Sequence, residues 1–221
     1  MGRSQQERSA STIARLKRAT VALIAERGYA SVTMSEIARR AEVSRGALLH
    51  HYPLKIDLII DAAEEVWREA AAEVRRLSEE LSRSAGYVDA FVDRMWERVF
   101  REEAVKMSLD LMSAAQADGD LRTRLDAALR QLFDSYDEIA DQVFAGSGLS
   151  RGERATLVSF ATCAIRGLRV QNIMAPSPGM TQAVLGELKA HLRTSLARGA
   201  GRREGRPDRP RIEPPQGSAG P

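Results

Sequence analysis

Arg45, Gly46 and Ala47 are the residues whose types and spacing best suit recognition chemistry in this chain. An arginine can donate two hydrogen bonds to O6 and N7 of guanine, and an alanine methyl can contact the methyl group of thymine. Glycine has no side chain, so the backbone at Gly46 can approach another molecule closely. Together the three residues favour contact with base edges in the major groove of duplex DNA.

Two short helices within residues 33–55 are predicted to position this trio. Thr33 followed by Glu36 is typical of a capping box, which starts the first helix. Ser44 is placed to cap the second helix, whose first exposed side chain is then Arg45. The pattern is that of a helix-turn-helix. An ordinary helical hairpin is the alternative, but capping, turn and small-residue placement agree with DNA binding.

A preceding helix and two inward-facing residues complete a three-helix module. The apolar residues before Gly28 follow helical spacing, and Gly28 suits the left-handed stop of that first helix. Glu42 and Val43 are expected to make the turn between the next two helices. Leu48 and Tyr52 lie four residues apart and are expected to face back toward the core.

Residues 13–55 resemble the DNA-binding domain of the tetracycline repressor (TetR) family of bacterial transcription regulators. The residues that carry the resemblance are Ile13, Leu16, Leu23, Glu26, Arg27, Gly28, Tyr29, Thr33, Ile37, Ala38, Val43, Ser44, Arg45, Gly46, Ala47, Leu48, His51, Tyr52 and Lys55. The resemblance implies contacts with the DNA backbone from Thr33, Ser35, Ser44, Leu49, His51 and Lys55. It implies base-facing positions for Arg45, Gly46, Ala47 and His50. The family usually has a phosphate-binding tyrosine where this chain has Leu49, which lacks the hydroxyl.

The histidines and the cysteine admit other interpretations. His50 and His51 could be metal ligands, but neighbours on a helix point about 100° apart, and the family pattern explains both better. No metal and no cofactor is expected. Cys163 is the one cysteine of the chain and lies in an apolar run, which favours a buried, inert thiol over a redox sensor. A single cysteine excludes an internal disulfide and suggests a reducing compartment.

Charge is distributed unevenly along the 221 residues, which carry a formal net charge of +3. Residues 1–55 contain 10 Lys and Arg against 4 Asp and Glu, a net charge of +6, so the remainder carries −3. Basic charge therefore gathers on the module that resembles a DNA reader, where it favours attraction to phosphates. A generic basic surface is the alternative.

Composition favours helix over sheet throughout the chain. Hydrophobic residues make up 43%, enough for a core, whereas aromatic residues make up only 5%. The expectation is an all-α fold of about nine helices, without a convincing strand. It comprises an N-terminal three-helix helix-turn-helix domain (1–55) and a C-terminal helical effector-binding and dimerisation domain (56–198). The last helices are expected at about 151–174 and 181–197. The tail 199–221 is rich in Gly, Pro and Arg and is expected to be disordered.

Two groups of residues in the C-terminal domain are candidates for sites. Apolar faces with small residues on the last two helices suggest a four-helix dimer interface, formed by Phe160, Ala164, Gly167, Leu168, Gln171, Leu185, Leu188, Leu192 and Leu196. An intramolecular core is the alternative. Aromatic and soft apolar side chains suggest an effector cavity lined by Phe91, Met95, Trp96, Phe100, Met107, Leu111, Met112, Phe133 and Tyr136. Such residues are more often core than ligand contacts.

The resemblance implies a ligand-responsive transcriptional repressor. It would bind a palindromic DNA operator as a homodimer and be released by an unknown small-molecule effector, through a shift of the helix that follows Lys55. A DNA-binding activator and a ligand-independent nucleoid-associated protein remain open. The sequence leaves the effector, the operator and the regulated genes undefined.

An all-helical enzyme is the alternative from another class. Helical di-metal enzymes need Glu-x-x-His pairs, whereas Glu187 and His191 lie four residues apart and unaccompanied. No His-Glu-x-x-His motif and no paired cysteine ligands occur, so an enzyme is not expected. The chain has no secretory signal pattern and no membrane-length apolar run, which predicts a cytoplasmic protein without a membrane partner.

Overall fold

A computed structural model describes residues 5–81, 86–144 and 146–204 of the chain. The described residues form nine α-helices, one 3-10 turn and one π-helical turn, with no strand. The elements are α1 (Gln5–Arg27), η1 (Tyr29–Ser31), α2 (Met34–Arg40), α3 (Arg45–His51), α4 (Lys55–Leu81), α5 (Tyr87–Arg94), η2 (Met95–Val99), α6 (Glu102–Ala114), α7 (Gly119–Val143), α8 (Arg151–Met174) and α9 (Pro178–Glu204). The predicted all-α fold class is therefore confirmed.

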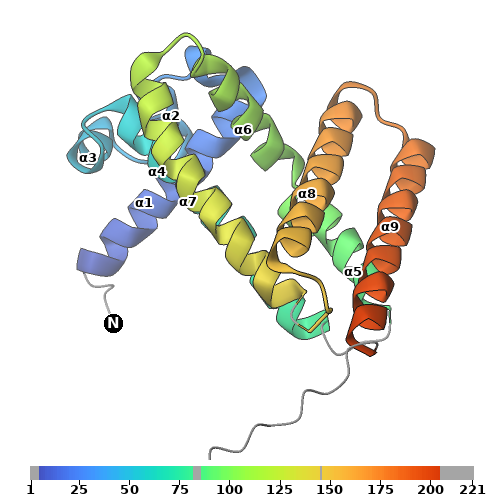
Figure 1. Cartoon of the computed structure of the whole chain (residues 1–221). Coiled ribbons are helices and arrows are strands. Elements are labelled where there is room, and N and C mark those ends of the chain that lie inside the picture. The colour runs from blue at the N-terminus through green and yellow to red at the C-terminus, as the bar shows by residue number, and fades with distance from the viewer. Residues whose placement is uncertain (1–4, 82–85, 145, 205–221) are drawn as a thin grey trace, which may run out of the picture.

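The first half of the molecule packs around α1. Helices α1 to α3 form a compact head, and α3 lies at its outer edge, away from the remaining helices (Figure 1). Fully buried side chains of the head, among them Leu16, Ile37 and Leu48, share one apolar cluster with residues of α4, α6 and α7. Met107 and Leu111 of α6 belong to this cluster and are completely buried. They are core residues and do not line a cavity, in contrast to the sequence-based expectation.

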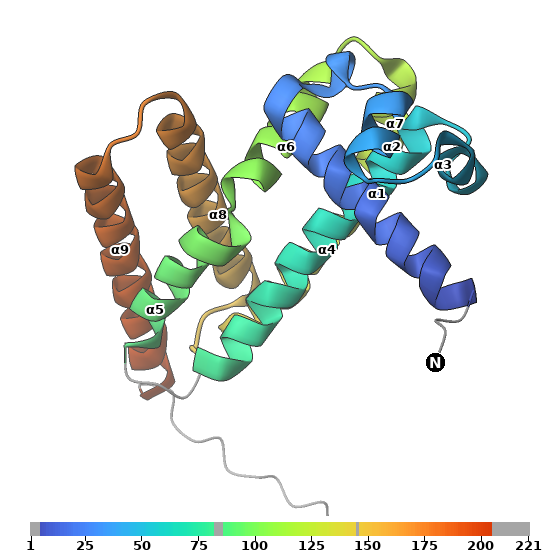
Figure 2. The same ribbon diagram turned by 180° about the vertical axis from the view of Figure 1, so that it is seen from behind.

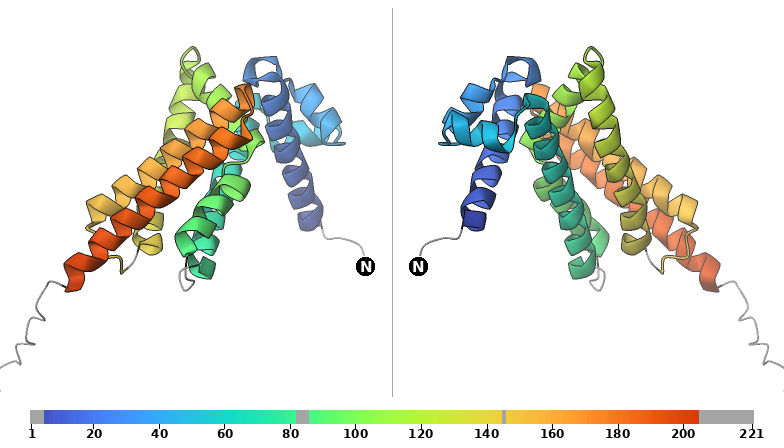
Figure 3. Two further views of the ribbon diagram at one scale, coloured as in Figure 1. Left: turned by 90° about the vertical axis from the view of Figure 1, so that its right-hand side faces the viewer. Right: turned by 90° about the vertical axis from the view of Figure 1, so that its left-hand side faces the viewer.

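A second apolar cluster joins the other end of α4 and α7 to α5, η2, α8 and α9. Helices α8 and α9 run antiparallel and form the edge of the molecule opposite α3 (Figures 1 and 2). Seen from the side, the two helices lie next to each other along their whole length (Figure 3). Helix α4 spans both clusters, so it connects the head with the half of the molecule that contains α8 and α9.

The last helix is longer than its sequence pattern predicts. It begins at Pro178, where the missing amide hydrogen of proline is harmless, and continues to Glu204. Residues 199–204 were expected in a disordered tail, so that boundary is corrected. Gly199 is buried, and a Cβ at this position would lie only 2.4 Å from the carbonyl oxygen of Ser147. Packing against the loop before α8 thus extends the helix. Residues 205–221 of the expected tail lie outside the described residues.

The π-helical turn η2 directly follows α5 and departs from regular α-helical hydrogen bonding. The amide of Phe100 donates to the carbonyl oxygen of Met95 over 2.9 Å, the wide spacing of a π turn. The Arg169 guanidinium of α8 donates to the carbonyl oxygens of Trp96 and Phe100, over 2.6 and 2.7 Å. It also stacks on the Trp96 ring, 3.5 Å from its centroid. Trp96 therefore packs against Arg169, which holds the turn in place.

Within the described parts of the chain, no helix has both the length and the apolar character that crossing a membrane requires.

Candidate DNA-binding surface and effector cavity

The two helices of the helix-turn-helix start at side-chain caps, as predicted. The Thr33 hydroxyl accepts from the amide of Glu36 over 3.3 Å, and the Glu36 carboxylate accepts from the amide of Thr33 over 3.0 Å. Hydrogen bonding with Thr33 holds the pKa of the Glu36 carboxyl below its ordinary value. The Ser44 hydroxyl accepts from the amide of Ala47 over 3.2 Å. Both helices are thus fixed at the ends that a DNA reader needs to orient.

A tight reversal joins α2 to α3. The amide of Val43 donates to the carbonyl oxygen of Ala38, and the amide of Glu42 donates to that of Arg39. This pair of hydrogen bonds is the Schellman arrangement, which places one residue in the left-handed region. Here that residue is Glu42, with a φ of 53°. The turn residues therefore match the sequence-based prediction, although glycine is the usual residue at this position.

The residues predicted to contact DNA lie at the start of α2, along α3 and at the start of α4. Thr33, Ser35, Ser44, Arg45, Gly46, Leu49 and His50 are exposed, whereas Ala47, His51 and Lys55 are partly buried. We refer to these ten residues as the recognition surface. Arg45 forms no ion pair with the described residues, so its guanidinium can reach outward. A Cβ at Gly46 would have no atom within 4 Å, so nothing in the fold requires glycine there. Leu48 and Tyr52 are buried beneath the surface.

Lys55 differs from the other members of the recognition surface because it is engaged inside the protein. Its ammonium group donates to the carbonyl oxygen of Tyr29 over 2.8 Å and lies 4.6 Å from the centroid of the Tyr29 ring. Burial lowers the pKa of Lys55. To bind a phosphate, the Lys55 ammonium group would therefore have to give up its hydrogen bond to the Tyr29 carbonyl oxygen or donate to both groups at once.

Tyr29 also ties the head to α6 and α7. Its amide donates to the Asp110 carboxylate, and its hydroxyl donates to the Asp118 carboxylate over 3.1 Å. Asp118 in turn caps α7 by accepting from the amide of Leu121. Two carboxylates therefore anchor Tyr29, the first residue of η1: Asp110 of α6 binds its amide, and Asp118 at the start of α7 binds its hydroxyl.

A cavity lies between α4, α6, α7, α8 and η2. It has a volume of about 80 Å³ and is partly open to solvent, and we call it the central cavity. Its lining consists of Val66, Trp67, Ala70, Ala71, Val74, Met95, Val99, Phe100, Ala104, Val105, Ser108, Leu109, Met112, Leu132, Tyr136, Ile139, Val158, Thr162 and Arg166. Most of the lining is apolar and a few polar groups accompany it, as is usual in sites for small molecules.

Sequence reasoning identified only some of the lining. Of the residues suggested as effector contacts, Met95, Phe100, Met112 and Tyr136 line the central cavity. Phe91 lines a smaller neighbouring cavity, Trp96 stacks on Arg169, and the side chain of Phe133 lies outside the described part of the structure. The contribution of α4 was missed, because this helix had been assigned only the role of connecting the two domains.

The suggested dimer-interface residues separate into two groups. Leu168, Leu185, Leu188 and Leu192 are buried in the chain's own core, and Leu196 packs against it, so these residues are not available to a second copy. Phe160, Gly167 and Gln171 are exposed, and Ala164 is partly exposed. The outward face of α8 and α9 also carries residues that the sequence analysis did not select: Cys163, Met174, Ala183, Gly186, Ala190 and His191.

Two side chains of this outward face correct or extend the sequence analysis. Cys163 is exposed, so the expectation of a buried thiol is wrong: α8 turns this residue away from the core. Phe160 is 47% exposed, and its ring lies 4.8 Å from that of His191, centroid to centroid. The outward face is therefore partly apolar and built largely from small side chains.

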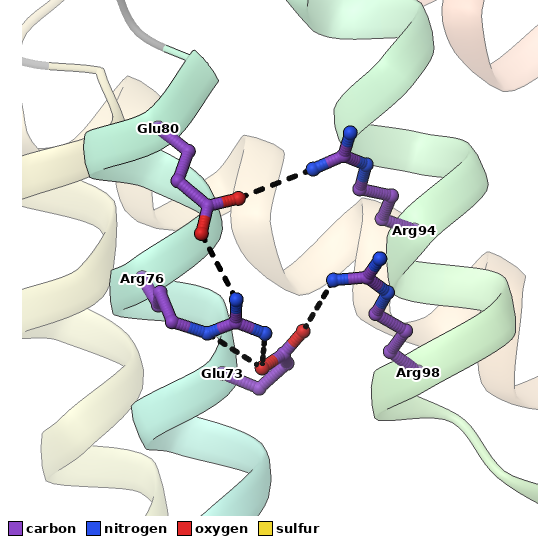
Figure 4. A network of polar contacts seen from close by, with 5 residues as sticks. All are labelled: Glu73, Arg76, Glu80, Arg94 and Arg98. Carbon is purple, nitrogen blue, oxygen red and sulfur yellow. Dashed lines mark hydrogen bonds and ion pairs between the residues drawn. The ribbon is translucent and has the colours of Figure 1, made fainter.

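Five charged side chains join α4 to α5 and η2 (Figure 4). Glu73 of α4 pairs with Arg76 and with Arg98 of η2, the latter over 3.4 Å. Glu80 pairs with Arg76 over 2.9 Å and with Arg94 of α5 over 3.2 Å. Hydrogen bonding with Arg76 holds the pKa of Glu73 below its ordinary value. The network thus joins α4 to η2, and both of these elements also line the central cavity.

The histidines do not form part of a metal centre in the described residues, where no group of three or more His, Cys, Asp or Glu side chains could hold an ion. The rings of His50 and His51 lie 5.4 Å apart, centroid to centroid.

A capped helix-turn-helix with an exposed second helix, joined to a helical domain that encloses a cavity, defines a class of DNA-binding transcriptional regulators. Residues 16–62 match the family model described as bacterial regulatory proteins, tetR family. The HTH-type transcriptional regulator CymR of Pseudomonas putida is 27% identical over 171 residues, which cover 77% of this chain and 84% of CymR. The chain is a helix-turn-helix transcriptional regulator that is similar to the TetR family.

Solved structures share this fold. A protein of Mesorhizobium loti described as a TetR-family transcriptional regulator superposes with a TM-score of 0.68 at 17% identity, covering 86% of this chain and 97% of that one. A transcriptional regulator from Saccharomonospora viridis, in complex with choline, gives a TM-score of 0.60 at 17% identity, covering 83% and 96% of the two chains.

Proposed function

We propose that this regulator is a ligand-responsive repressor that binds a palindromic operator as a homodimer and leaves it when a small molecule enters the central cavity. The observation that carries the proposal is the position of α4. This helix follows the recognition helix α3 directly, packs in the core of the head, and supplies five residues of the cavity lining. A ligand that moves α4 would therefore move the head.

In the proposed complex, the N-terminal end of α3 enters the major groove. Arg45, Gly46, Ala47 and His50 face the bases. Thr33, Ser35, Ser44, Leu49, His51 and Lys55 lie along the DNA backbone. Leu49 is 40% exposed and offers only apolar contact with the sugar-phosphate chain. The support is that α3 projects from the head, as Figure 1 shows, and that its outward side chains have few partners within the protein.

The homodimer is proposed to form through the outward face of α8 and α9. Phe160, Ala164, Gly167 and Gln171 contribute from α8, together with the small residues of α9. Two antiparallel helices meeting their symmetry mates make a four-helix bundle, in which small side chains permit close approach. This face lies on the side opposite α3 (Figure 1). A twofold axis there would leave both recognition helices free to reach one DNA duplex.

Release from the operator is proposed to be a population shift between two spacings of the recognition helices. To move the dimer from 1% to 99% released, the effector must prefer the second state by about 5.5 kcal/mol. The central cavity lies between α4 and η2, and the charged network of Figure 4 joins the same two elements. A ligand that moves α4 away from η2 would therefore alter the contacts that hold α4 in position. The choline complex of the S. viridis protein supplies a precedent for ligand binding on this fold.

Selection of DNA from a random pool by the purified chain tests the proposed operator. We expect enrichment of an inverted repeat with two half-sites, bound much more tightly than random competitor at the same salt concentration. Enrichment of unrelated sequences would contradict the proposal. The sign of regulation is tested separately by transcription from a promoter that carries the selected sequence, where the repressor model predicts less transcript when the protein is added.

A ligand-independent architectural role is the second candidate. It predicts a solid C-terminal core, whereas the described residues leave a cavity of about 80 Å³ with aromatic and polar groups in its walls. The cavity thus favours a sensing regulator.

A further inference from the structure

Among the described residues that line the central cavity, one side chain is charged. Arg166 lies on α8, and no Asp or Glu occurs among the cavity residues that the structure describes. Other arginines of α8 have partners elsewhere: Arg154 pairs with Asp141 over 2.7 Å, and Arg169 donates to backbone carbonyls of η2. Arg166 makes no ion pair with any described carboxylate. Its charge is therefore available to a molecule inside the cavity.

Two hydroxyl groups accompany Arg166. Thr162 precedes it by one helical turn and lines the same cavity. Tyr136 of α7 also lines the cavity, and its hydroxyl is hydrogen-bonded to Arg166. Burial raises the pKa of Tyr136, with Arg166 opposing the shift, so the phenol keeps its proton near neutral pH and can donate it to another oxygen. A guanidinium and two hydroxyls thus lie at one side of the apolar space.

We propose that the effector is an apolar monoanion, best represented by a carboxylate, whose charged end binds Arg166, Thr162 and Tyr136. The inference rests on the proposed function, because it names the ligand class of the same cavity. A planar carboxylate can accept two parallel hydrogen bonds from a guanidinium. Its apolar body would then lie against Trp67, Phe100 and their aliphatic neighbours.

Charge balance excludes the other simple classes of ligand. A cationic ligand would meet the like charge of Arg166 without a carboxylate among the described lining residues to offset it. A phosphate dianion would leave one negative charge without a partner in an apolar surrounding, which is costly. A neutral ligand would leave the charge of Arg166 without an anion in the cavity. One negative charge per ligand matches one arginine.

Two dyes with a common skeleton test the charge requirement on the purified full-length chain. The probe 8-anilinonaphthalene-1-sulfonate is a monoanion, and N-phenyl-1-naphthylamine is the same aromatic body without the charge. Fluorescence titration gives the affinity of each dye for the wild type, for Arg166→Gln and for Arg151→Gln. Arg151 is the matched control because it lies on the same helix but is exposed and outside the cavity. Octanoate and octanamide then serve as competitors in the same assay.

The proposal predicts that Arg166→Gln weakens binding of the anionic dye by about tenfold or more, leaves the neutral dye within about twofold, and leaves Arg151→Gln like the wild type. Octanoate should displace the anionic dye from the wild type at least about tenfold better than octanamide. Equal effects of Arg166→Gln on both dyes, or binding of neither dye, would overturn the proposal. If only the neutral dye binds, the anion requirement fails while an effector cavity, and with it the proposed function, stands.

Discussion

Glu42 has a left-handed backbone conformation at the reversal between α2 and α3, where its φ is 53°. A side chain with a Cβ is strained in that region by roughly 1 to 2 kcal/mol, and glycine is not. The strain is tolerated because the amides of Glu42 and Val43 both satisfy carbonyls at the end of α2. Backbone hydrogen bonds, more than the glutamate itself, therefore determine the turn.

Glu42→Gly is expected to raise the free energy of unfolding by about 0.5 to 1 kcal/mol, because relief of the strain exceeds the added entropy of the unfolded chain. Urea denaturation of the purified protein measures it. Glu42→Ala is the matched control, since it removes the same carboxylate but keeps the Cβ, and it should gain little. A lower stability of the glycine variant than of the alanine variant would contradict this interpretation of the turn.

Arg45→Ala is expected to weaken binding to the selected operator by about 1 to 3 kcal/mol and to relax base preference at one position of each half-site. Loss of a bidentate contact with guanine is the physical reason. Competition binding against operators with each base substituted measures both effects. Arg130→Ala, an exposed arginine of α7 far along the chain from the head, should leave affinity and base preference unchanged. Unaltered base preference in Arg45→Ala would refute the proposed docking.

The features of single residues that the sequence predicted correctly are those that depend on neighbouring residues in the chain. The caps at Thr33 and Ser44, the turn at Glu42 and the inward direction of Leu48 each depend on residues within four positions, so the sequence contains them. The engagement of Lys55 by Tyr29 joins residues 26 positions apart, and no local pattern indicates it.

Among the elements, α6 connects the cavity walls with the head in addition to α4. Ala104, Val105, Ser108, Leu109 and Met112 line the central cavity, whereas Asp110 on another side of the helix accepts from the amide of Tyr29. A shift of α6 would therefore displace η1, whose Tyr29 also contacts Lys55 at the start of α4. This gives α6 a second route from the cavity to the head.

Asp110→Ala is expected to lower the free energy of unfolding by about 1.5 to 3 kcal/mol, because the partly buried amide of Tyr29 loses a charged acceptor. Chemical denaturation measures it. Glu103→Ala removes an exposed carboxylate from the same helix and should change stability by less than about 0.5 kcal/mol. If both variants were equally stable, Asp110 would not be the anchor of η1.

Helix ends and helix interiors differ in how far the sequence predicts them. The bounds of α8, residues 151–174, agree with the sequence pattern because Ser150 and Glu153 form a local capping box. The π turn η2 depends on Arg169, some 70 positions away in the chain, and the extension of α9 depends on Ser147. Such features result from packing between distant segments, so they were not predictable.

At the scale of the whole molecule, the outward face of α8 and α9 is the surface proposed to join two copies. Gly167 lies in the middle of α8, and a Cβ there would have no atom within 4 Å in the single chain. A large side chain at this position therefore fits the monomer but would obstruct a close helix crossing between copies. In the proposed dimer, glycine at this position would permit the close approach that a large side chain would block.

Gly167→Arg is expected to fold normally and to raise the dissociation constant of the dimer by at least about tenfold. Analytical ultracentrifugation measures the dimer, and thermal unfolding verifies the fold. Gly152→Arg is the control: it adds the same side chain to an open position near the start of α8. A dimer of Gly167→Arg as tight as that of Gly152→Arg would place the interface elsewhere.

Which apolar residues line the cavity and which fill the core is a property of the whole molecule. Met107 and Met112 lie on the same helix and have the same chemistry, yet the first is completely buried and the second lines the cavity. Composition identified both as candidates. Only the way in which five elements pack around the space separates them.

Hydroxyl-radical footprinting on the DNA sequence that the protein selects is the most direct test of the account, because it reports the spacing of the two recognition helices. The account predicts two protected segments on one face of the duplex, related by symmetry and separated by about one helical turn, roughly 10 base pairs, or a multiple of it. A single protected segment, or uniform protection of selected and random DNA alike, would contradict it.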